Sequence, residues 1–210
     1  ALALTGANVA VTENAATDLA ASTVSGTLGI TSTGAVTDSG TLAITGATTI
    51  SASGQDITLN EAASTFGTLA LTGANVAVTE NAATDLGAST VSGTFGITSG
   101  GAITDSGTQT ITGASTFTNT AGTNDAITLD DVSNDFSGTV TFSTDSGSAV
   151  TIVDTTALDL LALSAASLSV TAGGAVTDSG TLAITGATTI SASGPVSYTH
   201  LRAHETHIDL

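Results

Sequence analysis

The sequence has 210 residues, of which 18 are acidic and only one, Arg202, is a Lys or Arg, so its formal net charge is −17. Such a negative chain repels phosphate, which excludes nucleic acid and anionic membranes as favoured partners and leaves divalent cations and basic surfaces. Cysteine is absent, which excludes disulfides, thiolate metal sites and a cysteine nucleophile.

From the N-terminus onward, short runs alternate apolar residues with small or polar ones, and Gly, Asn, Asp or Ser closes each run. This period of two is typical of half-buried strands joined by turns. Only the stretch 157–168 has some helical character, and its Leu158 and Leu160 still alternate as in a strand. The sequence therefore predicts an all-β protein, with strands at Val9 and Val11, Leu28 and Ile30, Leu42 and Ile44, Ile57 and Leu59, Leu69 and Leu71, Val76 and Val78, Phe95 and Ile97, Ile127 and Leu129, Val140 and Phe142, Val150 and Ile152, Leu168 and Val170, and Leu182 and Ile184.

The chain repeats itself over most of its length. Two pairs of segments are identical and two are similar: residues 2–19 with 69–86, 34–54 with 174–194, 23–40 with 90–107, and 56–69 with 125–140. The sequence of the first pair, LALTGANVAVTENAATDL, begins at Leu2 and begins again at Leu69. The chain therefore contains nearly three copies of a unit of 67–73 residues, which indicates a repeat architecture.

Many short strands, a fixed super-period and no alternation of helix with strand leave a β-solenoid, a propeller or tandem β-sandwich modules. Sandwich modules of this size usually keep a distinctive core aromatic, whereas this sequence has no Trp and five scattered Phe. A solenoid needs only small and medium apolar residues, because each coil is buried by the next. We therefore predict a parallel β-helix over residues 1–194, with three coils of roughly 22 residues per unit, roughly nine coils in all and a length of about 43 Å.

The succession DITL, NDFSGTV and LSVTAGGAVTDSGTLAITGATTI resembles the repeat regions of filamentous-haemagglutinin-like exoproteins, which are bacterial adhesins of the two-partner secretion and autotransporter type. The resemblance covers residues 1–194. It implies a right-handed parallel β-helix, secretion across a Gram-negative outer membrane with the help of an outer-membrane partner, and a role in adhesion or biofilm. It implies no catalytic residues.

The C-terminal stretch 195–210 differs in composition from everything before it. It contains the only Lys/Arg, the only Tyr, the only Pro and all three His, and the repeat stops abruptly at Gly194. His200, His204 and His207 have the spacing of metal ligands on a helix, although HETH is not the HExxH motif of zinc proteases. The letters VSYTHLRAHET are a translation that resembles a transposase adapter used in sequencing libraries. We therefore predict that residues 195–210 are a non-native, disordered tail.

The stretch AGTNDAITLDD at 121–131 is the strongest metal candidate in the body of the chain. Asp125, Asp130 and Asp131 offer the hard oxygen ligands that calcium prefers. The alternative is that these acids form turns and keep the chain soluble. Asp130 and Asp131 are also the only adjacent carboxylates, but neighbours on a strand would point to opposite faces, which argues against paired acid–base catalysis.

The sequence therefore predicts a structural stalk segment of a secreted bacterial surface adhesin, without catalysis and without a cofactor unless calcium binds. Its expected partners are the flanking repeats of the same chain and unidentified receptors or glycans, at the cell surface. Two alternatives remain open: a carbohydrate-active β-helix enzyme, and a calcium-binding surface-layer repeat.

Overall fold

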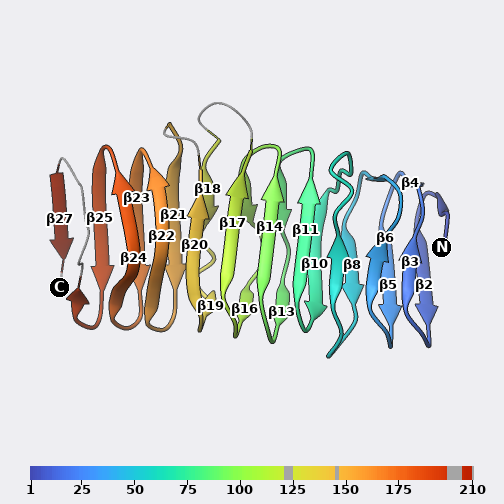
Figure 1. Cartoon of the computed structure of the whole chain (residues 1–210), viewed down its shortest axis with the longest axis horizontal. Helices are drawn as coiled ribbons and strands as arrows, with labels where there is room; N and C mark the ends of the chain where they lie inside the picture. The colour runs from blue at the N-terminus through green and yellow to red at the C-terminus, as the bar shows by residue number, and fades with distance from the viewer. Residues whose placement is uncertain (121–124, 145–146, 198–204, 210) are drawn as a thin grey trace.

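The computed structural model describes residues 1–120, 125–144 and 147–197, together with the backbone of 205–209. These residues form strands, turns and no helix. Figure 1 shows the strands side by side along one long axis, with the N-terminus at one end of a rod. Every strand pairing is parallel, so that each strand lies against the strands one turn earlier and one turn later. The protein is therefore a β-solenoid, as predicted.

Two large sheets form opposite faces of the rod, and a short third sheet accompanies the first at the N-terminal end. Sheet I has ten strands: β3 (Thr17–Leu19), β6 (Val36–Asp38), β9 (Ile57–Leu59), β11 (Val76–Glu80), β14 (Phe95–Ser99), β17 (Ser115–Asn119), β20 (Thr139–Ser143), β22 (Leu158–Ala165), β24 (Val176–Ile184) and β26 (Val196–Ser197). Sheet II has 14 strands: β2 (Val9–Glu13), β5 (Leu28–Ser32), β8 (Thr48–Ser51), β10 (Thr68–Gly73), β12 (Thr84–Leu86), β13 (Ser89–Val91), β15 (Ile103–Asp105), β16 (Gln109–Ile111), β18 (Ile127–Leu129), β19 (Asp135–Phe136), β21 (Ala149–Asp154), β23 (Ser167–Ala172), β25 (Ala187–Ala192) and β27 (Glu205–Asp209). Sheet III has three strands: β1 (Thr5–Gly6), β4 (Ser22–Val24) and β7 (Leu42–Ile44).

The strand register gives the length of one coil. Val76 pairs with Phe95 on the next coil, and Phe95 pairs with Ser115 on the coil after that. A coil therefore contains roughly 20 residues, which is within the usual size of a solenoid repeat. The longest coil runs from Ser115 to its register partner Val140. The ten strands of sheet I are separated by nine such turns, which confirms the predicted number of coils. At a strand spacing of about 4.8 Å, nine turns span about 43 Å.

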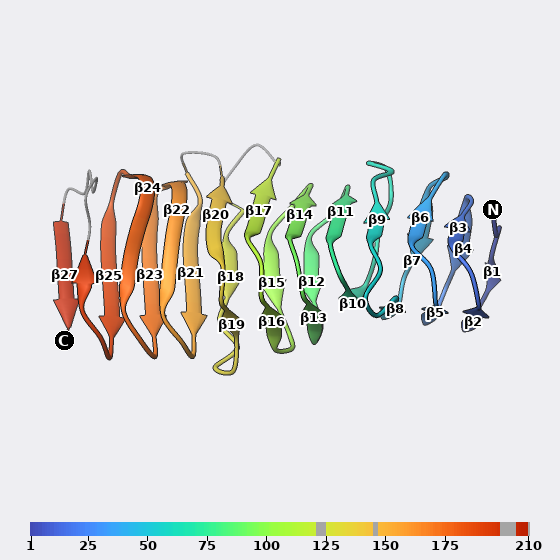
Figure 2. The same ribbon diagram turned by 60° about the horizontal axis from the view of Figure 1, so that its bottom comes forward.

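The sequence unit is three and a half turns long, and the prediction of three turns was wrong. One turn contributes one segment to each face, and a segment is either one long strand or two short strands in line, as Figure 2 shows for β12 with β13 and β15 with β16. The unit that begins at residue 69 has seven segments: β10, β11, β12 with β13, β14, β15 with β16, β17, and β18 with β19. Because seven is odd, the next unit begins on the opposite face.

Equivalent strands of successive units consequently lie in different sheets. β2 and β5 belong to sheet II, whereas their repeats β11 and β14 belong to sheet I. Two units restore the original face: β6 and its repeat β24 both lie in sheet I, seven strand intervals apart. The repeat therefore combines a translation along the rod with half a turn about it.

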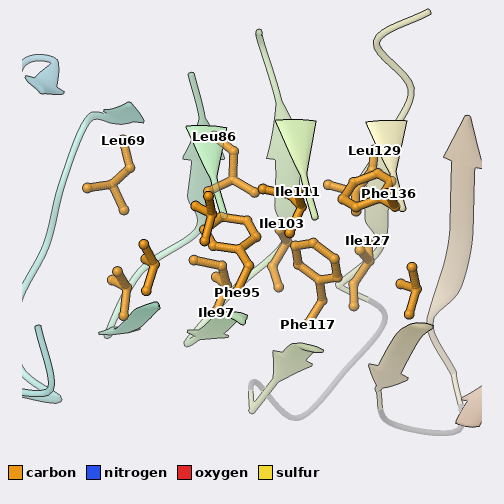
Figure 3. Close-up of a cluster of buried hydrophobic side chains, with 14 of the residues drawn as sticks. Leu69, Leu86, Phe95, Ile97, Ile103, Ile111, Phe117, Ile127, Leu129 and Phe136 are labelled. Atoms are coloured by element: carbon orange, nitrogen blue, oxygen red, sulfur yellow. The ribbon is translucent and has the colours of Figure 1, made fainter. Parts of the chain in front are cut away.

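The core lies between the two faces and is filled by the inward half of each strand. Alternate residues of β14, Phe95, Ile97 and Ser99, are buried, which is the predicted period of two. Phe95, Phe117 and Phe142 lie on three successive coils, and the ring of Phe117 is 5.8 Å from the first and 5.7 Å from the last. Figure 3 shows Phe95, Phe117 and Phe136 pointing into this core. Aromatic contacts of this kind add about 0.5–1.5 kcal/mol each beyond area burial.

The segment 157–168 is extended, as predicted, and carries one irregularity. Its strand β22 pairs with β20, but the register skips one residue: Val140 faces Leu160 and Thr141 faces Ala162. Leu161 is the extra residue of this bulge, and its side chain is 40% exposed. A bulge thus explains why a large apolar residue lies on the outside of the rod.

Glycines occupy the corners where coils approach closely. A Cβ atom at Gly113 would collide with the carbonyl oxygen of Gly93, one coil earlier. In the TDSG tetrad, a Cβ atom at Gly107 would collide with the amide nitrogen of Ala88. In the SASG tetrad, Gly54 has a φ of 74°, a conformation that favours glycine. Both tetrads therefore need glycine as their last residue.

The structure gives strand conformation to the described parts of the C-terminal stretch. Val196–Ser197 form β26 against β24, and the backbone of Glu205–Asp209 forms β27 against β25. This differs from the expectation of disorder over 195–210. The origin of these residues stays a prediction, which sequencing of the source DNA across the codon for Gly194 would test.

Candidate functional site

Asp130 and Asp131 lie in the turn after β18 and not on a strand, so the argument from the alternating faces of a strand does not apply to them. Both donate their peptide N–H groups to the carboxylate of Asp105, with N–O distances of 2.8 Å and 3.3 Å. The side-chain amide of Asn134 donates to the same carboxylate at 2.6 Å. The Asp105 carboxylate therefore accepts three hydrogen bonds from the turn that follows β18.

Asp125 lies before β18, and its peptide carbonyl accepts a hydrogen bond of 2.8 Å from the side-chain amide of Asn119. The strand Ile127–Leu129 separates it from Asp130 and Asp131. Within the described parts of the chain, no group of three or more acidic or histidine side chains is placed to hold a metal ion. Calcium binding by Asp125, Asp130 and Asp131 stays a prediction.

The contact between Asp105 and the turn recurs one unit earlier. Asp38 accepts hydrogen bonds from the peptide N–H groups of Asn60 (2.8 Å) and Glu61 (3.2 Å), which are the equivalents of Asp130 and Asp131. Burial raises the pKa of Asp105, and the hydrogen bonds from the turn partly oppose this rise. These carboxylates act as caps for the turn of the following coil, a use of Asp that the sequence reasoning attributed only to turns in general.

Glu80 is a buried carboxylate that links two coils. It ends β11, points inward and is only 2% exposed. Its Oε1 accepts the peptide N–H of Phe66, in the preceding coil, at 2.9 Å, and its Oε2 accepts the hydroxyl of Thr84 at 2.9 Å. The peptide N–H of Asn81 also donates to the carbonyl of Ser64 at 2.9 Å. The corner after β11 is therefore fastened to residues 64–66.

Asp154 has the same place one unit later. It ends β21, is 1% exposed and accepts the peptide N–H of Phe136 at 3.3 Å. Its other oxygen accepts the peptide N–H and the hydroxyl of Thr156, at 2.7 Å and 2.9 Å. Phe66 and Phe136 are the aromatic residues of the two similar segments 56–69 and 125–140, so the two carboxylates are equivalent.

Both carboxylates lie where one unit ends and the next begins. Phe66 and Phe136 follow the turns 60–64 and 130–134, which close the last coil of each unit. At these points the peptide N–H finds its acceptor in a side chain of the next unit instead of in a backbone carbonyl. We call the contacts Phe66–Glu80 and Phe136–Asp154 the junction clamps. The sequence reasoning missed them.

The electrostatics of the clamps follow from burial without a counter-ion. Residues 1–197 contain no Lys or Arg, and the α-amino group of Ala1 pairs with Asp18, at 3.9 Å. Desolvation raises the pKa of Glu80 to about 7, although its hydrogen bonds from Phe66 and Thr84 act in the opposite direction. Desolvation also raises the pKa of Asp154. Glu80 can therefore bind and release a proton near neutral pH.

The histidine cluster of the C-terminal stretch falls outside the described residues. His200, Arg202 and His204 are not described, and only the backbone is described for Glu205 and His207. Zinc binding there stays an untested alternative to a foreign tail.

Comparison with known proteins identifies a repeat family. The model of a family described as repeats of unknown function (DUF5649) matches residues 6–72, 73–143 and 147–200. These three matches correspond to the three sequence units. No curated protein and no solved structure matches the chain. The described residues contain no helix that is long and apolar enough to cross a membrane.

Proposed function

We propose, from the premise that this chain belongs to the DUF5649 family of repeats, that it is a structural rod, a stalk segment of a secreted bacterial surface adhesin. The observation that carries the proposal is the continuity of the sheets across unit boundaries. Sheet I runs through all three units without a break, so each added unit lengthens the same rod. At about 4.8 Å per turn, a unit of three and a half turns adds about 17 Å.

The proposed location is the bacterial cell surface, outside the outer membrane. The resemblance to filamentous-haemagglutinin-like exoproteins supports this, as does a body without Lys, Arg or Cys, which needs neither a reducing compartment nor an anionic partner. The proposed partners are the flanking repeats of the same chain, an outer-membrane secretion partner, and receptors or glycans held by other parts of the adhesin.

The rod is proposed to have no catalytic role. Asp130 and Asp131, the only adjacent carboxylates, direct their peptide groups at Asp105 and lie in a turn that serves the coil before it. Glu80 and Asp154 are buried, so that a substrate could not reach them. This arrangement supports a structural use of the acids.

The test uses the identity of residues 2–19 and 69–86. A copy of residues 2–68 inserted after Thr68 is followed by the same residues as in the natural chain, so it extends the solenoid without a new junction. We expect the maximum dimension measured by small-angle X-ray scattering to grow by about 17 Å per copy. A chain that grows sideways, or not at all, would contradict the proposal.

A second measurement tests the stalk role itself. Chains with zero, one or two extra units are placed between a surface anchor and a binding domain on a bacterial cell with a thick capsule. We expect binding to a bead-bound target to increase with the number of units. The matched control is a flexible Gly/Ser linker of about ten residues per unit, whose r.m.s. span of about 17 Å equals the length that a unit adds to the rod but which lacks the rod's stiffness. Equal binding with rod and linker would reject the role as a spacer.

A further inference from the structure

Each boundary between units is closed by one buried carboxylate, and this regularity calls for an explanation beyond support of a rod. Glu80 clamps the first boundary and Asp154 the second, and Asp135 is the acidic group that faces Asp154. We propose that the boundaries are proton-dependent: Glu80 holds two units together as the neutral acid, and its ionisation loosens the contact between residues 60–66 and β11.

The geometry suits the neutral acid. In that state the carbonyl oxygen of Glu80 accepts the N–H of Phe66, and the acid's hydroxyl donates to the oxygen of Thr84, since a threonine hydroxyl can both donate and accept. Both hydrogen bonds of the clamp are thus kept without any buried charge.

The ionised form keeps the same two hydrogen bonds but places a charge in the core. The groups that contact it are neutral: Phe66 in the preceding coil and Thr84 after the corner. On the next coil its register partner is Ser99, which is also neutral. The acids on the elements packed around it are Glu61, in the turn below, and Asp85, whose carboxylate accepts hydrogen bonds from Thr68 and Ser106. No cation compensates the charge, so ionisation costs free energy.

The sign of the effect follows from linkage. The folded chain binds the Glu80 proton more tightly than the unfolded chain, because burial raises the pKa from 4.5 to about 7. The contribution to stability is therefore fully present below about pH 4.5 and is lost as the pH rises through about 7. A chain with many units would carry one such clamp per unit.

The chain contains its own control. Glu13 lies in the identical sequence VAVTENAATDL, but its side chain is only half-buried, and the residue equivalent to Phe66 would precede Ala1. Glu13 and Glu80 therefore have the same neighbours in sequence, but only Glu80 is covered by a preceding coil that contains a Phe66 contact. A change at Glu13 reports what glutamate contributes without a clamp.

The first experiment measures thermal unfolding of the full chain from about pH 5 to about pH 8.5, for the wild type, Glu80→Gln and Glu13→Gln. Glutamine keeps the acceptor for Phe66 and carries no charge. We expect the melting temperature of the wild type and of Glu13→Gln to fall by several degrees over this range, and that of Glu80→Gln to fall clearly less. Equal falls in the wild type and Glu80→Gln would overturn the proposal, as would a wild type that becomes more stable with rising pH.

A second experiment needs no variant. The chain has four glutamates, Glu13, Glu61, Glu80 and Glu205, whose side-chain carboxyl carbons can be labelled with ¹³C and titrated by NMR. We expect one resonance to titrate near pH 7 and hydrogen exchange of residues 60–66, corrected for its intrinsic pH dependence, to increase about tenfold or more above that pH. Titration of all four below about pH 5.5 would overturn the proposal.

Discussion

Residues 2–19 and 69–86 have the same sequence but different surroundings. In the second segment Leu69 and Leu71 are fully buried, whereas Leu2 and Leu4, their equivalents, are only partly buried. The strands Val9–Glu13 and Val76–Glu80 coincide in the two segments, whereas β10 (Thr68–Gly73) is longer than its equivalent β1 (Thr5–Gly6). The difference is that the second segment has a coil on either side. Burial in this fold is therefore a property of stacking and not of the strand's own sequence.

The two segments also lie on opposite faces of the rod. The outward hydroxyls Thr12, Thr31 and Ser51 form a ladder on sheet II in the first unit. In the second unit the equivalent ladder lies on sheet I, where Thr79 pairs with Thr98 and Thr98 pairs with Thr118. An outward-facing group that occurs once in each unit, such as this hydroxyl ladder, therefore lies on sheet II in one unit and on sheet I in the next.

The largest expected loss of stability comes from shortening a fully buried leucine of the second segment. Leu71→Ala leaves a cavity between two covering coils and should cost about 2–5 kcal/mol of unfolding free energy. Leu4→Ala, in the same local sequence, should cost roughly 1 kcal/mol or less, because its side chain is already partly in water. Chemical denaturation of both variants measures the difference. If both variants lost the same unfolding free energy, the local sequence and not the stacking of coils would determine what each leucine contributes to stability.

A second prediction compares the stability cost of the same substitution at equivalent corner glycines of two successive units. Gly46→Ala and Gly113→Ala each place a Cβ atom in collision with a carbonyl oxygen, that of Gly26 or Gly93. Each should cost about 1–3 kcal/mol, and the two costs should be similar.

The matched control for the corners is Gly96→Ala, where the nearest atom to a new Cβ is 3.8 Å away. This change should be neutral or stabilise by up to about 1 kcal/mol, because alanine restricts the unfolded chain. Melting temperatures of the three variants test both statements. A corner variant as stable as Gly96→Ala would contradict the close approach of the coils.

A smaller effect is expected at a hydroxyl that every unit repeats. Thr48, Ser115 and Thr188 occupy the same inward position in successive units, and the hydroxyl of each is buried without a hydrogen-bond partner. Thr48→Val replaces the hydroxyl by a methyl group of similar size and should stabilise the chain by about 1 kcal/mol. The control is Thr49→Val on the exposed side of the same strand, which should be nearly neutral. Destabilisation by Thr48→Val would indicate a bound water.

The smallest effect is expected on removal of calcium. Because the described residues hold no group of three or more acidic or histidine side chains placed to bind a metal ion, a chelator should leave the melting temperature unchanged. Scanning calorimetry with excess calcium and with chelator measures this directly. A rise of several degrees with calcium would assign Asp125, Asp130 and Asp131 to a metal site.

Much of the fold could be predicted because the pattern and the physics coincide. The alternation of Val76 with Val78 predicts a strand with one buried side, and the structure has that strand. The half-turn per unit could not be predicted, because the sequence does not show where a coil closes. The role of Glu80 was also hidden, since Glu13 has the same neighbours in sequence and no clamp.

The sequence by itself determined the all-β class, the parallel stacking of similar units and the absence of positive charge from the body. These properties depend on residue type and on periodicity, which are local. Only the tertiary structure decided which face each unit presents, which carboxylates link two coils, and which acids cap turns. Those properties depend on the number of residues in a coil and on contacts between coils about 20 residues apart, and no local pattern records such contacts.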